Sequence, residues 1–461
     1  MMFLEIELPA ILSSEVAAAT PFRILTLLIF AAAVIHTLMA NHFTSLAKKV
    51  DSAHARKERG RKGPKKVSFF AETLYFLGEV EIIFALWVVP LVIVITSFYG
   101  WDDVIQYLNS RIYVEPFFIV VVMSLASTRP IIKMAEKGMK AVANLFGGST
   151  KAWWLALLTI GPILGSLITE AAAMTITALL FKEKLFEQSP SKRLAYATLG
   201  VMFVHFSVGG LLTNFAAPPA LTLSRCWNWE LSDFFSQFGM RVIIGILIVN
   251  ALYFFFLRKD FDHLKPARGE KVNEEPHGAI PFWVTAVHLV LLVWIVMMAH
   301  YPPVFLGSYL LFLGFHQATR HHQYALNLKR PLMVGLFLAG LVIHGGFQGW
   351  WIKPLLGDLG FGAMMLSGTI LTAFNENTTV AYLACFLDDL SPRLQYALVS
   401  GLVAGGGLTI IAHAPNPIGR ALLQPYFKKG ISPWNLFLGA LIPTLIFLSI
   451  FYFFPAIKGI S

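Results

Sequence analysis

Apolar stretches about 20 residues long recur from one end of the chain to the other. A helix of that length crosses the hydrocarbon core of a bilayer, which is about 30 Å thick. Only 13% of the residues are charged, against about 25% in a soluble domain, and the stretches lack the alternation of barrel strands. The sequence therefore predicts an all-α polytopic membrane protein embedded in the lipid bilayer, with ten full spans at residues 22–41, 77–99, 114–132, 194–222, 240–257, 281–299, 303–318, 331–348, 393–422 and 433–454.

Basic residues predict the orientation of the chain. The loop at residues 48–66 holds nine Lys or Arg against two acidic residues, and such loops stay in the cytoplasm. The N-terminus is then expected outside, and basic residues also follow the later spans that should end inside. We attribute the net charge of +10 to the concentration of Lys and Arg in cytoplasmic loops, and we do not interpret it as a sign of nucleic-acid binding. The expected location is the cell (inner) membrane.

Two further apolar segments do not fit as ordinary spans. Residues 152–181 and 361–387 are each too long for one crossing and too short for two. Lysines flank the first segment at both ends, whereas Asp358, Asp388 and Asp389 flank the second. We therefore expect two re-entrant hairpins that enter the membrane from opposite faces.

Similar motifs follow the two hairpins. GGLLTNFAAPP at 209–219 and GGLTIIAHAPN at 406–416 both start with paired glycines and reach an Ala-Pro element at the same offset. Proline lacks the helical N–H donor and disfavours helix in the residue before it. Segments 194–222 and 393–422 are therefore predicted to be broken helices, although proline and glycine also kink ordinary membrane helices.

The repeated order of spans, hairpin, broken helix and final span predicts two inverted repeats. The expected organisation is a first span with the basic loop (1–70), a first repeat (71–258), a cytoplasmic linker (259–280) and a second repeat (281–461). Inverted repeats with broken helices are typical of secondary transporters, whose sites lie near the bilayer midplane. Unpaired backbone groups are tolerated at that depth only where they are buried in protein or line a cavity.

Glu170 and Glu376 are the acidic residues inside the two hairpins. An ionised group at the bilayer centre costs at least about 2.5 kcal/mol on insertion scales, which indicates a function. A carboxylate binds either a cation or a proton, as an exchanger requires. We expect Glu376 to be the main exchanging group and Glu170 its symmetric partner. The alternative is that one glutamate pairs permanently with His413 or His205 to hold the core.

Sodium is a hard cation that prefers oxygen ligands. His413, in the second broken helix, is a candidate proton relay, although a satisfied core histidine is the commoner case. No cofactor is expected beyond the transported Na⁺ and H⁺. The oxygen ligands expected around the two glutamates are Thr169, Thr213, Asn214, Asn375, Asn377, Thr378 and Asn416.

Cysteine and histidine spacing argues against an enzyme. Cys226 and Cys385 predict neither a disulfide framework nor a metal site, and we interpret each as a small packing residue. His205, His344 and His413 could surround a metal only if the fold gathered them, because no HExxH pair is present.

GGGLTIIAHAPNPIG at 405–419, with TAFNENTTVA upstream and GGLLTNFAAPP in the first half, resembles the Putative Na⁺/H⁺ antiporter family. That family belongs to an ion-transporter superfamily with arsenite permeases and divalent-anion/sodium symporters. The resemblance covers the chain from about residue 70 onward. It implies a homodimer, with a scaffold and a transport domain in each protomer, and an elevator-like movement. It also implies that residues 131–148 form an interfacial arm helix, which their basic, amphipathic pattern favours.

One departure from the superfamily bears on the substrate. Dicarboxylate symporters carry a Ser-Asn-Thr triplet at each hairpin tip, whereas the tips here read TEA at 169–171 and NENT at 375–378. A carboxylate at each tip would repel a dianion. The sequence therefore favours exchange of Na⁺, or of Li⁺ or K⁺, for H⁺ by alternating access. The alternative is a small-anion or arsenite transporter of the same superfamily.

Overall fold

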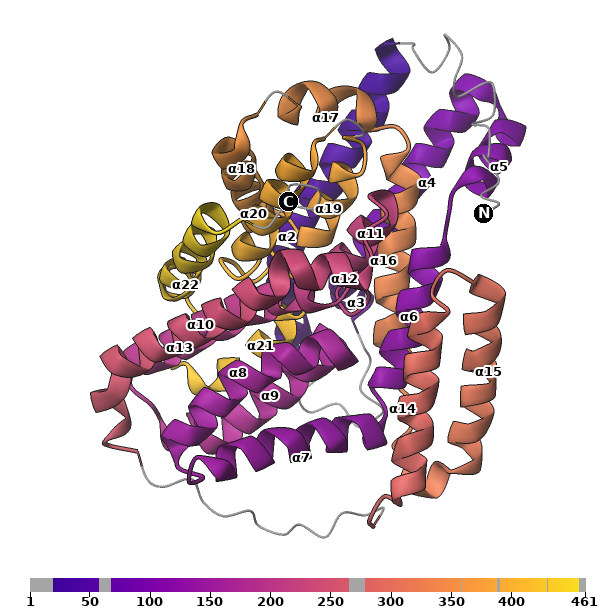
Figure 1. Ribbon diagram of the computed structural model, residues 1–461. Coiled ribbons are helices and arrows are strands. Elements are labelled where there is room, and N and C mark those ends of the chain that lie inside the picture. Colours follow the sequence, from indigo (N-terminus) through magenta and orange to yellow (C-terminus); the bar gives the residue numbers. More distant parts are fainter. Residues whose placement is uncertain are drawn as a thin grey trace. The chain divides into compact units, whose positions relative to one another are not determined.

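The computed structural model describes residues 20–57, 68–264, 278–357, 359–387, 390–428 and 430–455 (Figure 1). Within these ranges every regular element is helical. Asp358, Asp388 and Asp389, together with parts of the loop at 48–66 and of the linker at 259–280, lie outside the described residues.

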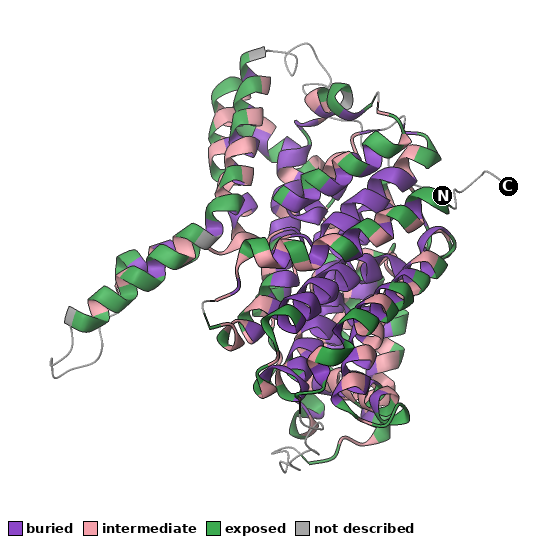
Figure 2. Ribbon diagram, turned by 90° about the vertical axis from the view of Figure 1, so that its left-hand side faces the viewer, coloured by how far each residue is buried: buried purple, intermediate pink, exposed green. Residues whose placement is uncertain are grey.

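Each predicted span overlaps a helix, but not every one of these helices is long and apolar enough to cross a membrane. Six helical stretches of the described residues meet that condition, or up to eight if two bent helix pairs each count as one span. Five of the six match the predicted spans 22–41, 77–99, 194–222, 240–257 and 433–454, whereas the sixth, Thr150–Ile168, lies in the segment predicted to be the first hairpin. Large apolar side chains such as Leu28, Ile93 and Phe256 are exposed, as lipid contact requires. Figure 2 shows exposed residues along the outer helices and buried ones inside the bundle. The helices are α2 (Thr20–Lys57), α4 (Val80–Tyr99), α6 (Val114–Ala126), α10 (Lys192–Gly209), α13 (Met240–Leu257), α14 (Phe282–Met297), α15 (Pro302–Ala318), α16 (Lys329–Gly345), α20 (Pro392–Gly405) and α22 (Pro433–Phe453).

One predicted span ends earlier than expected. The segment 114–132 is divided, because α6 stops at Ala126 and α7 (Arg129–Leu145) begins with Pro130 in its first turn. A proline at that position is compatible with a helix start but not with continuation of the preceding helix. Helix α6 therefore has 13 residues, and it follows α5 (Trp101–Ser110) in the chain.

The chain divides into two compact units. The first comprises residues 1–117 and 332–352. In it α2 packs against α3 (Phe69–Leu77) and α4, and α4 packs against α5. Its apolar core contains Phe22, Leu91, Ile95, Tyr107 and Phe347.

The second unit comprises residues 118–331 and 353–461, and it contains both hairpins and both broken helices. The first hairpin consists of α8 (Thr150–Ile168) and α9 (Glu170–Lys184), which pack against each other. The second consists of α18 (Phe361–Phe374) and α19 (Asn377–Ala384). Helix α8 ends just before Thr169, and α18 ends just before Asn375, so both segments are interrupted at the predicted polar tips. Their re-entry into the membrane stays a prediction.

Both predicted broken helices are interrupted at their glycine and proline motifs. Helix α10 ends at Gly209, and η2 (Gly210–Leu212) and an irregular stretch lead to α11 (Pro218–Cys226). Helix α20 ends at Gly405, and an irregular stretch leads to α21 (Asn416–Leu423). Proline occupies the first turn of α11 and of α21. Backbone N–H groups in a first turn have no acceptor within the helix, so a proline there removes no helical hydrogen bond.

Each broken helix of the second unit packs on one hairpin before its break and on the other hairpin after it. Helix α10 packs on α8, and α20 packs on α18, so each first half-helix lies on the hairpin of its own half. After the breaks, α11 packs on α19 and α21 packs on α9, so each second half-helix lies on the hairpin of the other half (Figure 1). The second break thereby contacts both hairpin tips, because His413 pairs with Glu170 and the carbonyl of Ala412 accepts from the Asn377 N–H.

The predicted arm segment is a helix, α7. Ile131, Ala135, Met139 and Ala143 recur at every fourth position and are buried, against α8, α9 and α14. Lys137 is exposed on the other side. The helix is therefore amphipathic as expected, and its place at a membrane interface stays a prediction.

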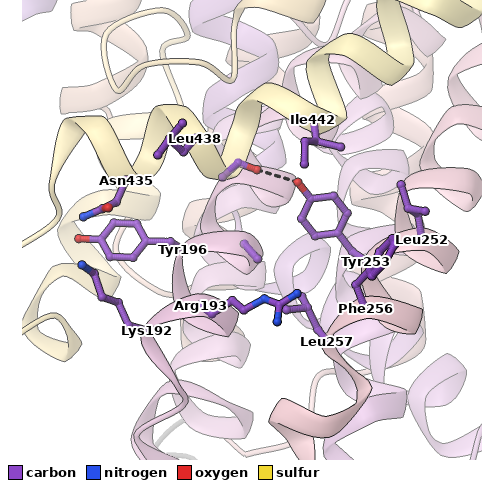
Figure 3. Close-up of a pocket in the computed structure, with 12 residues that line it drawn as sticks. Lys192, Arg193, Tyr196, Leu252, Tyr253, Phe256, Leu257, Asn435, Leu438 and Ile442 are labelled. Atoms are coloured by element: carbon purple, nitrogen blue, oxygen red, sulfur yellow. Dashed lines mark hydrogen bonds between the residues drawn. The ribbon is translucent and has the colours of Figure 1, made fainter.

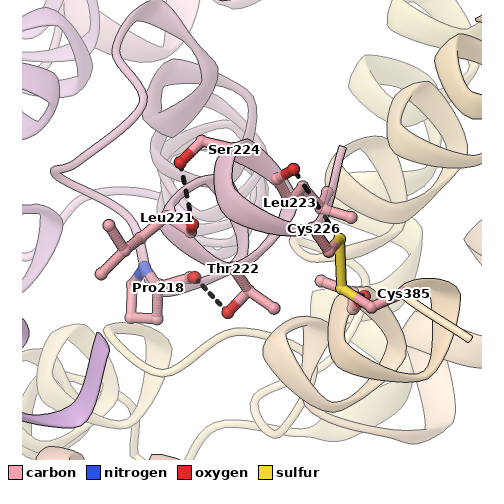
Figure 4. Close-up of a disulfide and its surroundings, with 8 residues drawn as sticks. Pro218, Leu221, Thr222, Leu223, Ser224, Cys226 and Cys385 are labelled. Carbon is pink, nitrogen blue, oxygen red and sulfur yellow. Dashed lines mark hydrogen bonds between the residues drawn. A yellow bond between two sulfur atoms is a disulfide. The ribbon is translucent and has the colours of Figure 1, made fainter. Parts of the chain in front are cut away.

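The interpretation of the two cysteines as packing residues is wrong. Cys226 and Cys385 form a disulfide, with their Cα atoms 5.5 Å apart (Figure 4). The pairing follows from the packing of α11 on α19, because each cysteine lies at the C-terminal end of one of these helices. The two cysteines are 159 residues apart in the sequence, so no local pattern indicated that they pair.

Candidate functional site

The tip of the first hairpin is strained. Thr169 has a φ of 103°, a conformation that residues with a Cβ rarely adopt and that costs about 1–3 kcal/mol. It is buried, and its hydroxyl has no hydrogen-bond partner among the described residues. Such strain is typical of functional sites, where the surrounding structure holds it.

Glu170 follows directly and pairs with His413. The Glu170 Oε2 and His413 Nε2 atoms are 2.8 Å apart, and the two side chains are 3% and 1% exposed. The other carboxylate oxygen, Oε1, has no partner among the described residues. Because His413 lies in the second break and Glu170 at the first hairpin tip, this pair joins the two halves of the second unit.

Gly210 lets the Glu170 carboxylate approach the first break. A Cβ placed at Gly210 would overlap Glu170 Oε1 and the Ala217 side chain. Glycine is therefore required at this position by close approach rather than by backbone conformation, since Gly210 has a right-handed helical φ of −56°.

Glu376 caps the second hairpin helix. Its carboxylate accepts hydrogen bonds from the Thr378 N–H (2.8 Å), the Thr378 hydroxyl (2.8 Å) and the Thr379 N–H (3.2 Å). The N-terminus of α19 also carries partial positive charge, which favours an anion there. Glu376 is thus a buried carboxylate whose oxygens already have donors, and His413 is close enough for their charges to interact.

Asn377 and Asn416 line the second break. The Asn377 N–H donates to the carbonyl of Ala412 (2.9 Å), the residue before His413. The Asn416 amide donates to the carbonyls of Gly406 (2.8 Å), at the end of α20, and Thr409 (2.9 Å), in the irregular stretch that follows. Asn416 therefore holds the irregular stretch in place, as a cap of the break.

The remaining predicted ligands are more peripheral. The Asn375 side chain accepts from the Glu376 N–H (2.9 Å) and is half-buried. The Thr213 hydroxyl donates to the carbonyl of Ser166 (2.8 Å), not to a glutamate, and Asn214 is half-buried in the same extended stretch.

Several buried oxygens around this cluster lack a hydrogen-bond partner. Buried polar atoms are nearly always hydrogen-bonded, and an orphaned one calls for a water or an ion. Hard oxygen donors of this kind suit an alkali or alkaline-earth cation rather than a soft metal. Among the orphaned oxygens of the described residues, those at the hairpin tips and the second break are Thr169 Oγ1, Glu170 Oε1, Asn377 Oδ1, Thr379 Oγ1 and Asn416 Oδ1.

Two serines belong to the site although the sequence analysis missed them. Ser166 on α8 donates to the carbonyl of Gly209, and Ser207 on α10 donates to the carbonyl of Val403 (2.8 Å). Each serine satisfies a carbonyl near the end of a helix that breaks. The available signal was a small polar residue within one turn of a predicted hairpin tip or break.

His205 does not join the cluster. Its Nδ1 atom bonds the carbonyl of Leu158 at 2.9 Å. Of the two histidines considered as partners for a glutamate, His413 is the one that pairs.

Helices long and apolar enough for a bilayer, with buried carboxylates at interrupted helices, define a membrane protein of the ion-transporting class. A sequence model of the Putative Na⁺/H⁺ antiporter family matches residues 21–454, and the chain belongs to that family. The predicted family resemblance is confirmed, and a transporter rather than an enzyme is indicated. No curated protein matches the chain.

Proposed function

We propose that the protein exchanges Na⁺ for H⁺ across the membrane, with the two ions competing at the Glu170–His413 pair. The observation that carries the proposal is the free Oε1 atom of Glu170, which has no partner among the described residues. It lies beside Thr169, whose buried hydroxyl is also orphaned. A carboxylate that already shares one oxygen with an imidazole retains the other for a cation.

Charge explains why the two ions exclude each other. A proton bound to this pair adds one positive charge, and Na⁺ bound to the same carboxylate would add a second. Two positive charges about 4 Å apart repel by about 4 kcal/mol at an effective dielectric constant of about 20. Simultaneous occupancy is therefore disfavoured by about a thousandfold, which is the condition for exchange rather than co-transport.

We assign Glu376 a different role from Glu170. The sequence favoured Glu376 as the exchanging group, but three donors from Thr378 and Thr379 already hold its carboxylate. This arrangement supports a Glu376 carboxylate that stays negatively charged. It attracts Na⁺ by its charge while its three hydrogen bonds from Thr378 and Thr379 remain in place. Asn377, whose amide atoms have no partner among the described residues, is the side chain best placed to complete the sodium shell.

Alternating access is proposed to come from the two inverted repeats, 71–258 and 281–461. The exchange of partners between α11 and α19 and between α21 and α9 supports this symmetry. An elevator-like movement in a homodimer follows from the family resemblance. Light scattering of the purified protein in detergent tests the dimer, which should have twice the protomer mass of 51.2 kDa.

The decisive experiment measures ²²Na⁺ uptake driven by a pH gradient in proteoliposomes. We expect Glu170→Gln to abolish exchange, and Glu376→Gln to retain it with a raised KM for Na⁺. Glu187→Gln is the matched control, because Glu187 is an exposed carboxylate of the same half. Undiminished, pH-dependent exchange in Glu170→Gln would show that the pair with His413 is structural. Proton-driven uptake of arsenite or another small anion, without sodium flux, would overturn the proposed substrate.

A further inference from the structure

A cavity of about 700 Å³ lies apart from the ion site, where the ends of three helices of the second unit meet (Figure 3). The first turn of α10, the last turns of α13 and the first half of α22 line it. None of the residues predicted for ion binding contributes to its wall.

Two tyrosine hydroxyls fix the walls of this cavity. Tyr253 on α13 donates to the carbonyl of Gly439 on α22 at 3.1 Å (Figure 3). The Tyr196 hydroxyl on α10 accepts from the N–H of Ser432, just before α22, at 2.9 Å. Gly439 also lets α22 approach the backbone of Tyr196 closely. The cavity is thus built into the helix packing.

The outer part of the wall is apolar and open. Phe256, Leu438 and Ile442 line the cavity and are 58%, 46% and 50% exposed, and Leu252 lies beside them (Figure 3). In a membrane-embedded helix bundle such side chains face hydrocarbon. A hydrocarbon chain that lies in the cavity would cover apolar surface of α13 and α22 together.

The polar end of the cavity carries two cations. Lys192 and Arg193, both exposed, stand at the start of α10, and among the described residues neither forms an ion pair. Two acidic residues follow α13, and the contacts of each are with groups other than Lys192 and Arg193, although Asp260 lies beside the start of α10. Asp262 pairs with Lys151 at 2.9 Å, which lowers the pKa of the Asp262 carboxyl. Asp260 accepts a hydrogen bond from the Ser191 hydroxyl at 2.6 Å.

We propose that this cavity binds an anionic phospholipid. The phosphate lies between Lys192 and Arg193, and an acyl chain runs along Leu252 and Phe256. Basic pockets between membrane helices on the cytoplasmic side bind anionic lipid headgroups, and the orientation predicted from the basic loop puts this end of α10 in the cytoplasm. The lipid would join α10, which leads to the first break, to α13 and α22.

The test measures lipid binding by native mass spectrometry, independently of ion exchange. Purified protein is titrated with phosphatidylglycerol, phosphatidylcholine or inorganic phosphate. We expect phosphatidylglycerol adducts to form preferentially, and Lys192→Ala/Arg193→Ala to weaken them about 10- to 30-fold. Lys48→Ala/Lys49→Ala, which removes two exposed cations of α2, should leave binding unchanged.

A second variant tests the acyl chain. Leu252→Trp fills the apolar part of the cavity and keeps both cations, so it should weaken phosphatidylglycerol binding while the thermal unfolding temperature without lipid stays close to wild type. Equal binding of phosphatidylcholine, equal binding by the Lys192/Arg193 variant, or saturation by inorganic phosphate alone would each overturn the proposal. Dissociation of an oligomer by Leu252→Trp, without a change in lipid adducts, would show that a second copy of the chain covers this face.

Discussion

At the scale of single residues, the two hairpin glutamates occupy different surroundings although the sequence presents them as equivalents. Glu170 shares one oxygen with His413 and leaves the other unpartnered among the described residues. Glu376 is held by the N-terminus of α19. Burial makes a charged carboxylate unfavourable at both positions. The two glutamates differ in their hydrogen-bond donors, and we attribute their different proposed roles, ion exchange and a fixed charge, to that difference.

His413 should position the Glu170 carboxylate for Na⁺. Its Nε2 atom lies 2.8 Å from Glu170 Oε2, so the loss of this contact in His413→Ala should raise the apparent KM for Na⁺ about tenfold or more. Initial rates of ²²Na⁺ uptake at a series of Na⁺ concentrations measure this. An unchanged KM in the variant would show that the contact does not hold the carboxylate for sodium.

Gly210 should tolerate no side chain. The methyl group of Gly210→Ala would meet the Glu170 carboxylate and Ala217, and overpacking of this kind costs about 1–3 kcal/mol. We expect exchange to fall at least tenfold and the unfolding temperature to drop.

Gly314→Ala provides the matched control for Gly210→Ala. Gly314 is also a helical glycine, but a Cβ there has no atom within 4 Å. This variant should keep full exchange activity. Equal activity of both variants would mean that the close approach of Gly210 to Glu170 has no functional consequence.

At the scale of elements, the disulfide joins the second half of the first broken helix, α11, to α19 of the second hairpin. Helices α11 and α19 both begin near the site and end at Cys226 and Cys385 (Figure 4). A disulfide forms in an oxidising compartment. The orientation predicted from the loop at 48–66 places both cysteines outside the cell membrane, so the pairing agrees with it.

Cysteine labelling tests both the pairing and the orientation. On intact cells we expect an impermeant maleimide to label the protein only after treatment with an impermeant reductant. Cys226→Ser/Cys385→Ser should remain unlabelled, and its stability should fall by about 2–5 kcal/mol, as for other native disulfides. Labelling of wild-type protein without reductant would contradict the disulfide, and labelling that requires permeabilised cells would contradict the orientation.

At the scale of the whole molecule, ion binding should stabilise the folded protein. A ligand at about 100 times its Kd adds about 2.7 kcal/mol to the free energy of unfolding. We expect Na⁺ to raise the thermal unfolding temperature of purified protein at alkaline pH, and choline at equal ionic strength to leave it unchanged. Glu170→Gln should lose the sodium effect. A similar shift in that variant would locate the cation away from Glu170.

The sequence alone determined the class of the molecule and the positions of the two hairpin tips and the two breaks. These depend on local properties, because apolar length decides membrane insertion and Gly-Pro motifs end helices wherever they occur. The tips at Thr169 and Asn375 and the breaks at 209–219 and 406–416 were predictable for that reason. The end of α6 was missed because the predicted span was extended to the isoleucines of α7, across Ser127, Thr128, Arg129 and Pro130, which interrupt the apolar sequence.

Only the tertiary structure decided which polar groups meet. The pairing of Glu170 with His413 spans 243 residues of sequence, and that of Cys226 with Cys385 spans 159. Both result from second half-helices that pack on the hairpin of the other half, and no local pattern encodes such a crossing. The difference between Glu170 and Glu376 has the same origin, since a carboxylate's chemistry depends on the donors that the fold brings to it.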